Sequence, residues 1–215
     1  MLYNLRMKLP RKRLFISKRA GDRERVKLIS KAVENNYDTI VFSLDDNFFK
    51  KNNKNFRYAK LARHNGLNIE AGGSDLPLLI PRWMFLFDKE LFRMVQGRRT
   101  PFYHFCPTNP KTTEIIAKRV RKLIERSLSS VSVPRTLHLL PDTRLKQENT
   151  WCQCPACRAF RPYEQYLIAV NAAADILAQY DHEAKIAYID FDTEPEAARI
   201  KPRKNAIICA PSSAK

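Results

Sequence analysis

The chain has 215 residues, 44% of them apolar, which is enough to bury one hydrophobic core. Its 39 Lys and Arg outnumber its 22 Asp and Glu, so the net charge is +17. Its five cysteines are odd in number, and the protein is too large to depend on a disulfide framework. Residues 1–17 lack the apolar stretch of a signal peptide, and no run approaches the roughly 20 apolar residues of a membrane span. We therefore expect a cytoplasmic protein without a membrane partner.

Strand-like and helix-like segments alternate after a basic segment at residues 1–13. Hydrophobic periodicity predicts three strands in the first half of the chain, at 14–17, 39–44 and 67–71. It also predicts two helices, at 23–36, with Val26, Ile29 and Val33 on one face, and at 56–64, ending at the Asn-Gly pair. A proline-punctuated stretch rich in aromatic and basic residues follows from 77 to 110.

The second half of the chain continues the alternation. A helix is predicted to start with Asn109 as its cap and Pro110 at its first position, and a second helix covers 162–180. Three further strands are predicted, at 136–140, 185–191 and 205–209. This order of elements indicates an α/β fold with a parallel sheet of about six strands, built from right-handed βαβ units.

Acidic residues gather in the loops that follow the predicted strands, at 45–46, 70–75, 142 and 190–194. In parallel-sheet proteins these loops carry the functional groups. The pattern is typical of an enzyme that uses carboxylates, although each acidic residue taken alone is also explained as a helix cap or a turn residue.

Three thiols lie within six residues, because residues 151–157 read Trp-Cys-Gln-Cys-Pro-Ala-Cys. Packing does not require this spacing, whereas soft thiolates at such a spacing can bind one tetrahedral ion. We predict a structural Zn²⁺ held by Cys106, Cys152, Cys154 and Cys157, with His104 as the alternative fourth ligand. A disulfide or redox role and buried free thiols are the other readings of the cluster.

Several short segments occur in one order along the chain: residues 70–76, 81–82, 106–110, 140–142, 151–157 and 171–174. Together they resemble the glycoside-hydrolase-like proteins that carry domain of unknown function 4838, distant relatives of α-glucuronidases. The resemblance extends from about residue 14 to residue 209. One departure is Ser74, where the family pattern has a histidine after the paired glycines.

The resemblance implies a (β/α)₈ TIM barrel that acts on or binds carbohydrate. It makes Asp142, at the end of the fourth strand, the acid/base candidate, with Glu70 and Asp75 as catalytic or substrate-contacting partners, since glycoside hydrolysis commonly uses two carboxyl groups. Trp83, Trp151 and Tyr103 are candidates for stacking on sugar rings. With six predicted strands instead of eight, we expect the domain at 14–210 to be a partial, C-terminally truncated barrel followed by a tail at 211–215, so any glycoside hydrolase activity stays open.

The high positive charge favours a second hypothesis, a non-catalytic, zinc-stabilised basic module that binds a polyanion, either nucleic acid or an acidic glycan. The basic residues are spread along the chain instead of forming an arginine-rich tail, which is also compatible with a solvated basic surface. A third hypothesis is a structural remnant without activity. The sequence leaves the oligomeric state open, and also whether a partner completes the barrel.

Overall fold

The computed structural model describes residues 12–17, 20–43, 54–73, 76–128, 136–141, 150–191 and 197–209. Six strands form a sheet that is parallel throughout, in the order β1-β2-β3-β6-β7-β8. Their bounds are β1 (Arg13–Ile16), β2 (Thr39–Phe42), β3 (Asn68–Gly73), β6 (Thr136–Leu139), β7 (Lys185–Tyr188) and β8 (Ala206–Ile208). The predicted α/β fold with a six-stranded parallel sheet is confirmed.

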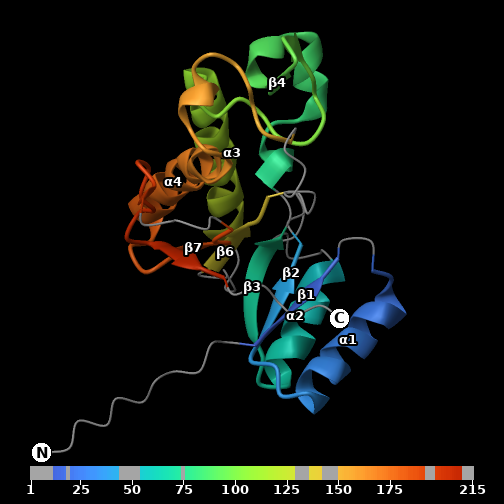
Figure 1. The fold of residues 1–215 in the computed structure, drawn as a ribbon. Coiled ribbons are helices and arrows are strands. Elements are labelled where there is room, and N and C mark those ends of the chain that lie inside the picture. Colours follow the sequence, from blue (N-terminus) through green and yellow to red (C-terminus); the bar gives the residue numbers. More distant parts are fainter. Residues whose placement is uncertain are drawn as a thin grey trace, which may run out of the picture.

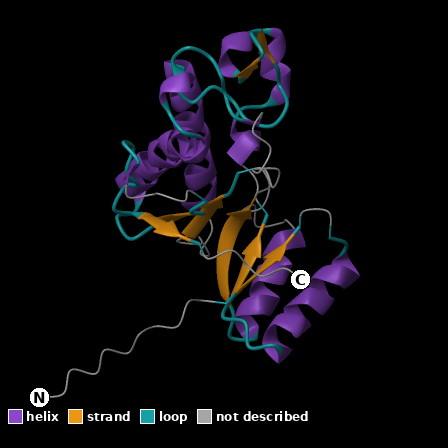
Figure 2. Ribbon diagram, in the orientation of Figure 1, coloured by secondary structure: helices purple, strands orange, loops and turns teal. Residues whose placement is uncertain are grey.

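Four helices connect successive strands of this sheet, as Figures 1 and 2 show. They are α1 (Asp22–Glu34), α2 (Lys54–His64), α3 (Pro110–Leu128) and α4 (Pro162–Tyr180). Helix α3 begins where the sequence predicts, and the Asn109 side-chain oxygen accepts a hydrogen bond from the Lys111 backbone N–H at 3.0 Å. Helix α4 begins at Pro162 and has Pro at its first position.

All four helices pack on the same face of the sheet. Ile40 and Ile69 lie side by side in the register and pack in one core cluster with residues of α1 and α2. Ala71 lies opposite Leu137, which lies opposite Ile186, and the latter two pack with residues of α3 and α4. Because paired residues of neighbouring strands point to the same side, one face of the sheet carries all four α-helices of the described residues.

This one-sided arrangement follows from the strand order. Successive strands are added in one direction along the sheet, and right-handed crossovers then place each connecting helix on the same face. A doubly wound sheet reverses its strand order and carries helices on both faces. The architecture is therefore that of a partial barrel-like α/β fold.

The buried face of α1 differs from the face predicted from Val26, Ile29 and Val33. Ile29 and Ala32 are buried, whereas Val26 and Val33 are 43% and 40% exposed. The helix contacts the sheet through a narrow stripe, and the two valines lie beside this stripe.

A separate lobe stands beyond the carboxyl ends of β3 and β6 (Figure 1). We define the lobe as residues 76–109 together with 150–161. It contains short 3₁₀ helices at Leu76–Leu79, Arg82–Leu86, Lys89–Leu91 and Cys157–Ala159, and an antiparallel hairpin of β4 (Met94–Val95) and β5 (Arg98–Arg99). The hairpin turns at Gln96 and Gly97, which both have positive φ. No helix among the described residues is long and apolar enough to span a membrane.

Candidate metal centre

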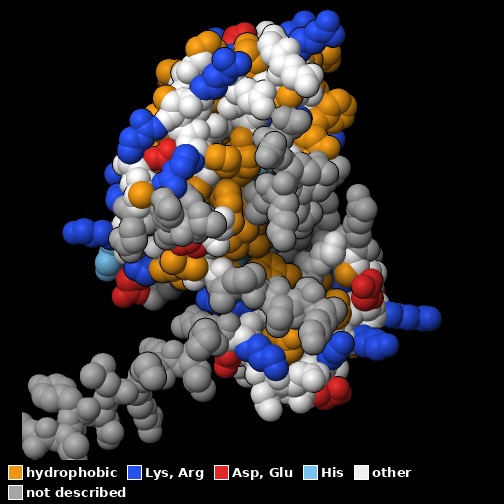
Figure 3. All heavy atoms as spheres, in the orientation of Figure 1, with side chains coloured by type: hydrophobic (Ala, Val, Ile, Leu, Met, Phe, Trp, Pro, Cys, Tyr) orange, Lys and Arg blue, Asp and Glu red, His pale blue; other side chains and the backbone are white. Residues whose placement is uncertain are grey.

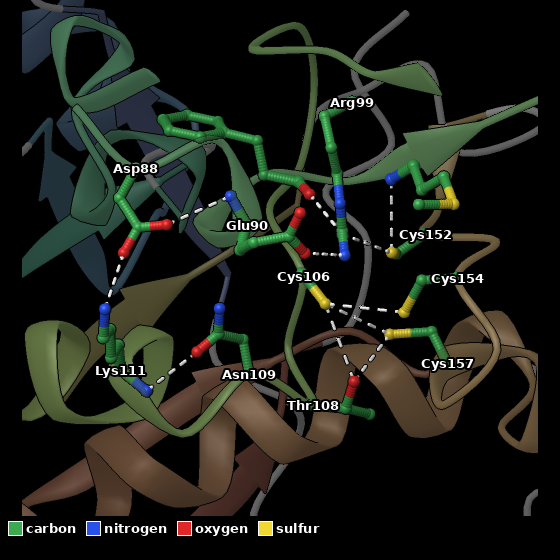
Figure 4. Close-up of polar contacts among 12 residues, drawn as sticks. Asp88, Glu90, Arg99, Cys106, Thr108, Asn109, Lys111, Cys152, Cys154 and Cys157 are labelled. Atoms are coloured by element: carbon green, nitrogen blue, oxygen red, sulfur yellow. Dashed lines mark hydrogen bonds and ion pairs between the residues drawn. The ribbon is translucent and has the colours of Figure 1, made fainter. Parts of the chain in front are cut away.

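Four buried sulfur atoms meet where the two segments of the lobe come together (Figure 4). Cys106 precedes α3, and Cys152, Cys154 and Cys157 precede α4. All four Sγ atoms lie within 4.8 Å of one another, and Cys106 Sγ lies 3.7 Å from the Sγ atoms of both Cys154 and Cys157. The structure thus brings together the four cysteines that the sequence predicts as metal ligands.

The spacing of these atoms fits a tetrahedral tetrathiolate site. A Zn–S bond of about 2.3 Å places the corners of a tetrahedron about 3.8 Å apart. The two distances of 3.7 Å from Cys106 Sγ agree with this value. Four soft donors without oxygen or nitrogen among them are a set that structural zinc sites use. The residues present therefore fit a structural Zn²⁺.

Hydrogen-bond donors surround the sulfur atoms, as they do in metal–thiolate centres. The backbone N–H of Met94 donates to Cys152 Sγ at 3.3 Å, and the Arg99 guanidinium approaches the same sulfur at 3.7 Å. The Thr108 hydroxyl lies 3.1 Å from Cys157 Sγ. These donors orient the sulfurs and offset part of the negative charge that four thiolates bring to one cation.

The cysteine pKa values show how strongly the sulfurs interact. Hydrogen bonds from Cys152 and Cys157 hold the pKa of the Cys106 thiol far below its usual range. The same interaction with Cys106 raises the pKa of Cys152 to about 11 and also raises the pKa of Cys157. Without a metal ion, ionisation of one thiol therefore disfavours ionisation of its neighbours. A divalent cation supplies the positive charge that allows all four thiols to ionise.

Helix α4 holds the cysteine loop in position through Gln165. Its side-chain oxygen accepts from the Cys152 backbone N–H at 3.1 Å, and its amide nitrogen donates to the carbonyls of Cys152, Cys157 and Phe160 at 3.1 to 3.2 Å. Gln165 is itself buried. These hydrogen bonds hold the backbone of the loop through a side chain that is not one of the four candidate ligands.

His104, the alternative fourth ligand, has a different place. Its ring stacks on that of Trp151 with centroids 4.3 Å apart and planes inclined by 10°. It is not part of the sulfur cluster, in which Cys106 provides the fourth donor. The stack joins the two segments of the lobe next to the cysteines.

Of the three predicted catalytic carboxylates, only Glu70 lies within the described residues; Asp75 and Asp142 lie outside them. Glu70 lies inside β3, since this strand continues to Gly73. Its side chain is buried, with 2% of the residue exposed. Its carboxylate accepts hydrogen bonds from Arg13 Nε at 2.7 Å and from His138 Nε2 at 2.6 Å. Burial by itself would raise the pKa of Glu70, but the hydrogen bonds from His138 and Arg13 outweigh it and lower the pKa to about 2.

The three aromatic residues proposed to stack on sugars are separated in the structure. Trp151 is buried between His104 and Phe191, whereas Trp83 is 60% exposed on the lobe. The Tyr103 ring packs against the Arg93 guanidinium, 4.8 Å from the ring centroid. They do not form a common platform.

Sequence reasoning missed the groups that support the cysteines, namely Arg99, Thr108 and Gln165. The Gln-Gly pair at 96–97 was a usable hairpin signal, since it predicts a tight turn that brings β5 back beside β4. No comparable signal marks Gln165, because its role depends on three carbonyls that only the folded loop brings together. The chain matches no family model and no curated protein.

Proposed function

We propose that the protein is a zinc-stabilised α/β module that binds a polyanion. The observation that carries the zinc assignment is the buried cluster of four cysteine sulfurs, drawn from two segments of the chain. Cys106 and Cys157 are 51 residues apart in sequence, so a shared ion would pin the loop after β3 to the loop after β6. Four protein ligands leave no open coordination position, which makes the role of the metal structural.

Exposed positive charges support the proposal that the protein binds a polyanion. Several exposed cations form no ion pair with a carboxylate of the described residues: Arg82, Lys89 and Arg98 on the lobe, and Lys118, Arg121 and Lys122 on α3. The whole chain carries a charge of +17. Such a surface gains affinity for a polyanion by releasing the counterions that the polyanion has condensed.

Metal content and thiol reactivity test the zinc centre. We expect one zinc per chain in purified protein and release of the protected thiols by a chelator. Cys154→Ser removes a ligand and should abolish stoichiometric zinc, while Cys209→Ser, which changes a buried cysteine outside the cluster, should leave it at one per chain. Absence of zinc together with five freely reacting thiols would refute the assignment.

Titration with heparin and with nucleic acid at several salt concentrations tests the proposed polyanion binding. We expect the logarithm of the affinity to fall linearly with the logarithm of the salt concentration. If the protein forms no salt-sensitive complex with either polymer, the binding proposal fails even where the zinc centre is confirmed.

A carbohydrate-active protein of glycoside hydrolase type is the second candidate, and the barrel-like arrangement of the sheet favours it. All strands end at one edge, where catalytic loops of such folds lie. Glu70 is ionised near neutral pH, so it fits a base or an electrostatic partner and not the general acid, a role that would fall to Asp142. Hydrolysis of a glycoside that Asp142→Asn abolishes would support this candidate, and hydrolysis unchanged by that substitution would remove Asp142 from the reaction.

A further inference from the structure

The tip of the lobe exposes large apolar side chains that the metal centre does not explain. Trp83 is 60% exposed, Leu86 80%, Phe87 82% and Phe102 57%. The rings of Trp83 and Phe87 meet edge to face with centroids 6.0 Å apart. In Figure 3 hydrophobic side chains reach the surface over the upper part of the molecule, with Lys and Arg side chains beside them. Clusters of exposed large apolar side chains are typical of binding surfaces.

Two cationic side chains, Arg82 and Lys89, lie over aromatic rings of the same segment. The Arg82 guanidinium lies over the ring of Phe102, 5.7 Å from its centroid, and Lys89 Nζ lies 5.8 Å from the centroid of Phe85. Both cations are exposed, and neither pairs with a carboxylate of the described residues. We call Arg82, Trp83, Leu86, Phe87, Lys89 and Phe102 the lobe patch.

The nearby acidic groups are already neutralised. Asp88 accepts from Lys111 Nζ at 3.0 Å, and Glu90 pairs with the Arg99 guanidinium. The lobe patch therefore combines exposed rings with positive charge that no carboxylate of the described residues pairs, the electrostatic complement of an anionic ligand that has flat faces.

We propose that the lobe patch binds single-stranded nucleic acid, with unpaired bases stacking on Trp83, Phe87 and Phe102 and phosphates near Arg82 and Lys89. This inference rests on the proposed polyanion binding and names the polymer. Each nucleotide presents one flat ring and one negative charge, which matches the interleaved rings and cations of the patch. A duplex keeps its bases inside the stack, so only an unpaired strand can place them on these side chains.

An acidic glycan fits the patch less well. Sugar hydroxyls require acceptors as well as cations, and Asp88 and Glu90, the carboxylates next to the patch in the described part of the chain, are engaged by Lys111 and Arg99. Leu86 and Phe87, the two most exposed apolar side chains of the patch, offer only apolar contact. Bases can use such contacts through their ring faces.

The metal centre gives this surface a fixed shape. Met94 and Arg99, from the β4–β5 hairpin next to the patch in sequence, both contact Cys152 Sγ. Glu90, one residue after Lys89, pairs with the same Arg99. A preordered surface loses less conformational freedom on binding than a flexible one, which favours the stacked complex.

Intrinsic fluorescence and anisotropy titrations of the zinc-loaded full chain test the proposal. The chain has two tryptophans, of which Trp151 is buried, so stacking of a base on Trp83 should quench the exposed component. The probes are a fluorescein-labelled oligothymidylate of about 15 nucleotides, the same length of duplex, heparin and vesicles containing anionic lipid. Zinc content is measured for every variant, which verifies that the lobe is intact.

We expect Trp83→Ala and Phe87→Ala each to weaken oligothymidylate binding by about fivefold or more, the lower end of the value of base–aromatic stacking. The control pair Val26→Ala and Val33→Ala, exposed apolar residues of α1, should have no effect. Arg82→Ala with Lys89→Ala should lower the salt slope by about 1.4, at roughly 0.7 per phosphate contact. Lys27→Ala with Lys31→Ala makes the same charge change on α1 and should leave the slope unchanged.

Other outcomes overturn the proposal in distinguishable ways. Equal affinity for duplex and single strand, or insensitivity to Trp83→Ala, would show that bases do not stack on the patch. Binding of heparin or of anionic vesicles that depends on Trp83, without such dependence for the oligonucleotide, would assign the patch to a glycan or to a lipid surface. Failure to bind any of the four probes would refute the proposed polyanion function itself.

Discussion

The sheet and the lobe differ in the balance of contacts that stabilises each of them. In the sheet region, strands of three to six residues bury apolar side chains against four helices, with Ile40, Ile186 and Leu167 fully buried. In the lobe, short 3₁₀ turns and a two-residue-per-strand hairpin offer little regular hydrogen bonding. Apolar residues such as Leu91 and Phe105 join the lobe to the core at α3 and α4, and the four sulfurs with their donors stabilise the part around the hairpin. The sheet should therefore fold without metal, whereas the part of the lobe around the sulfurs should depend on it.

This difference separates two kinds of information in the chain. Apolar periodicity defines the sheet and helices, and many residues share the resulting stability. The lobe shares part of this core through residues such as Leu91, Phe92 and Phe105, but its sulfur centre depends on four side chains, so a single substitution there removes a large share of the local stability.

The strongest test of the comparison is Cys154→Ser. Loss of a ligand should cost the lobe several kcal/mol, because structural zinc contributes on the order of 10 kcal/mol to the folding of small domains. Hydrogen exchange should then rise in the β4–β5 hairpin and around Cys106, next to the sulfurs, and remain slow in β2 and β7. Equal protection of the lobe with and without zinc would contradict the division.

Ile186→Ala tests the opposite side of the comparison. Ile186 is fully buried in β7, and truncation of such a side chain costs about 2–5 kcal/mol. We expect a lower midpoint of thermal unfolding for the whole protein, with one zinc per chain still bound at low temperature. Val33→Ala, at a 40% exposed position of α1, is the matched control with little expected change.

Glu70→Gln sharpens the comparison inside the sheet, where a charged group is buried between Arg13 and His138. The pKa of Glu70 is lowered from 4.5 to about 2 on folding, which corresponds to a stabilisation on the order of 3 kcal/mol. A depressed pKa contributes fully above pH 4.5 and is lost as the pH falls toward 2. Denaturant titrations should show that the variant is less stable at pH 7 and loses less stability than the wild type over this range. A parallel pH dependence would remove Glu70 from the acid response.

The smallest expected effect is that of Thr108→Val, which keeps the shape of the side chain but removes its contact with Cys157 Sγ. Loss of one outer contact should weaken zinc binding by about tenfold. Competition with a chromogenic chelator measures this change. Thr113→Val provides the control, since the Thr113 hydroxyl donates to the Pro110 carbonyl and contacts none of the four sulfurs.

Prediction from the sequence succeeded where local chemistry determines the structure. The Asn109-Pro110 pair predicted the start of α3, and the Cys-Gln-Cys-Pro-Ala-Cys segment with Cys106 predicted which four sulfurs come together in a candidate metal site. It was weaker where tertiary packing decides. The third strand extends to Gly73 because glycine at position 72 lets β6 approach closely: a Cβ there would lie 2.0 Å from the His138 carbonyl oxygen.

The surroundings of the site were beyond prediction for the same reason. Arg99 contacts Cys152 across 53 residues of sequence, and Glu70 contacts His138 across 68. Periodicity and spacing describe neighbours along the chain, whereas these partners are set by the order of strands and by the path of the lobe. The exposure of Trp83 and Phe87 likewise depends on packing that their sequence context, rich in apolar residues, does not reveal.

The separation of the two cysteine segments in sequence also determines when the four cysteines become available during translation. Cys106 leaves the ribosome about 50 residues before Cys157, which at 5–20 residues per second is an interval of roughly 3 to 10 s. For most of that interval, until Cys152 and Cys154 follow shortly before Cys157, the nascent lobe has one of its four cysteines, and Trp83 and Phe87 have already left the ribosome. Cellular zinc supply and chaperone access at this stage of translation would then decide how much of the newly made protein reaches its folded state.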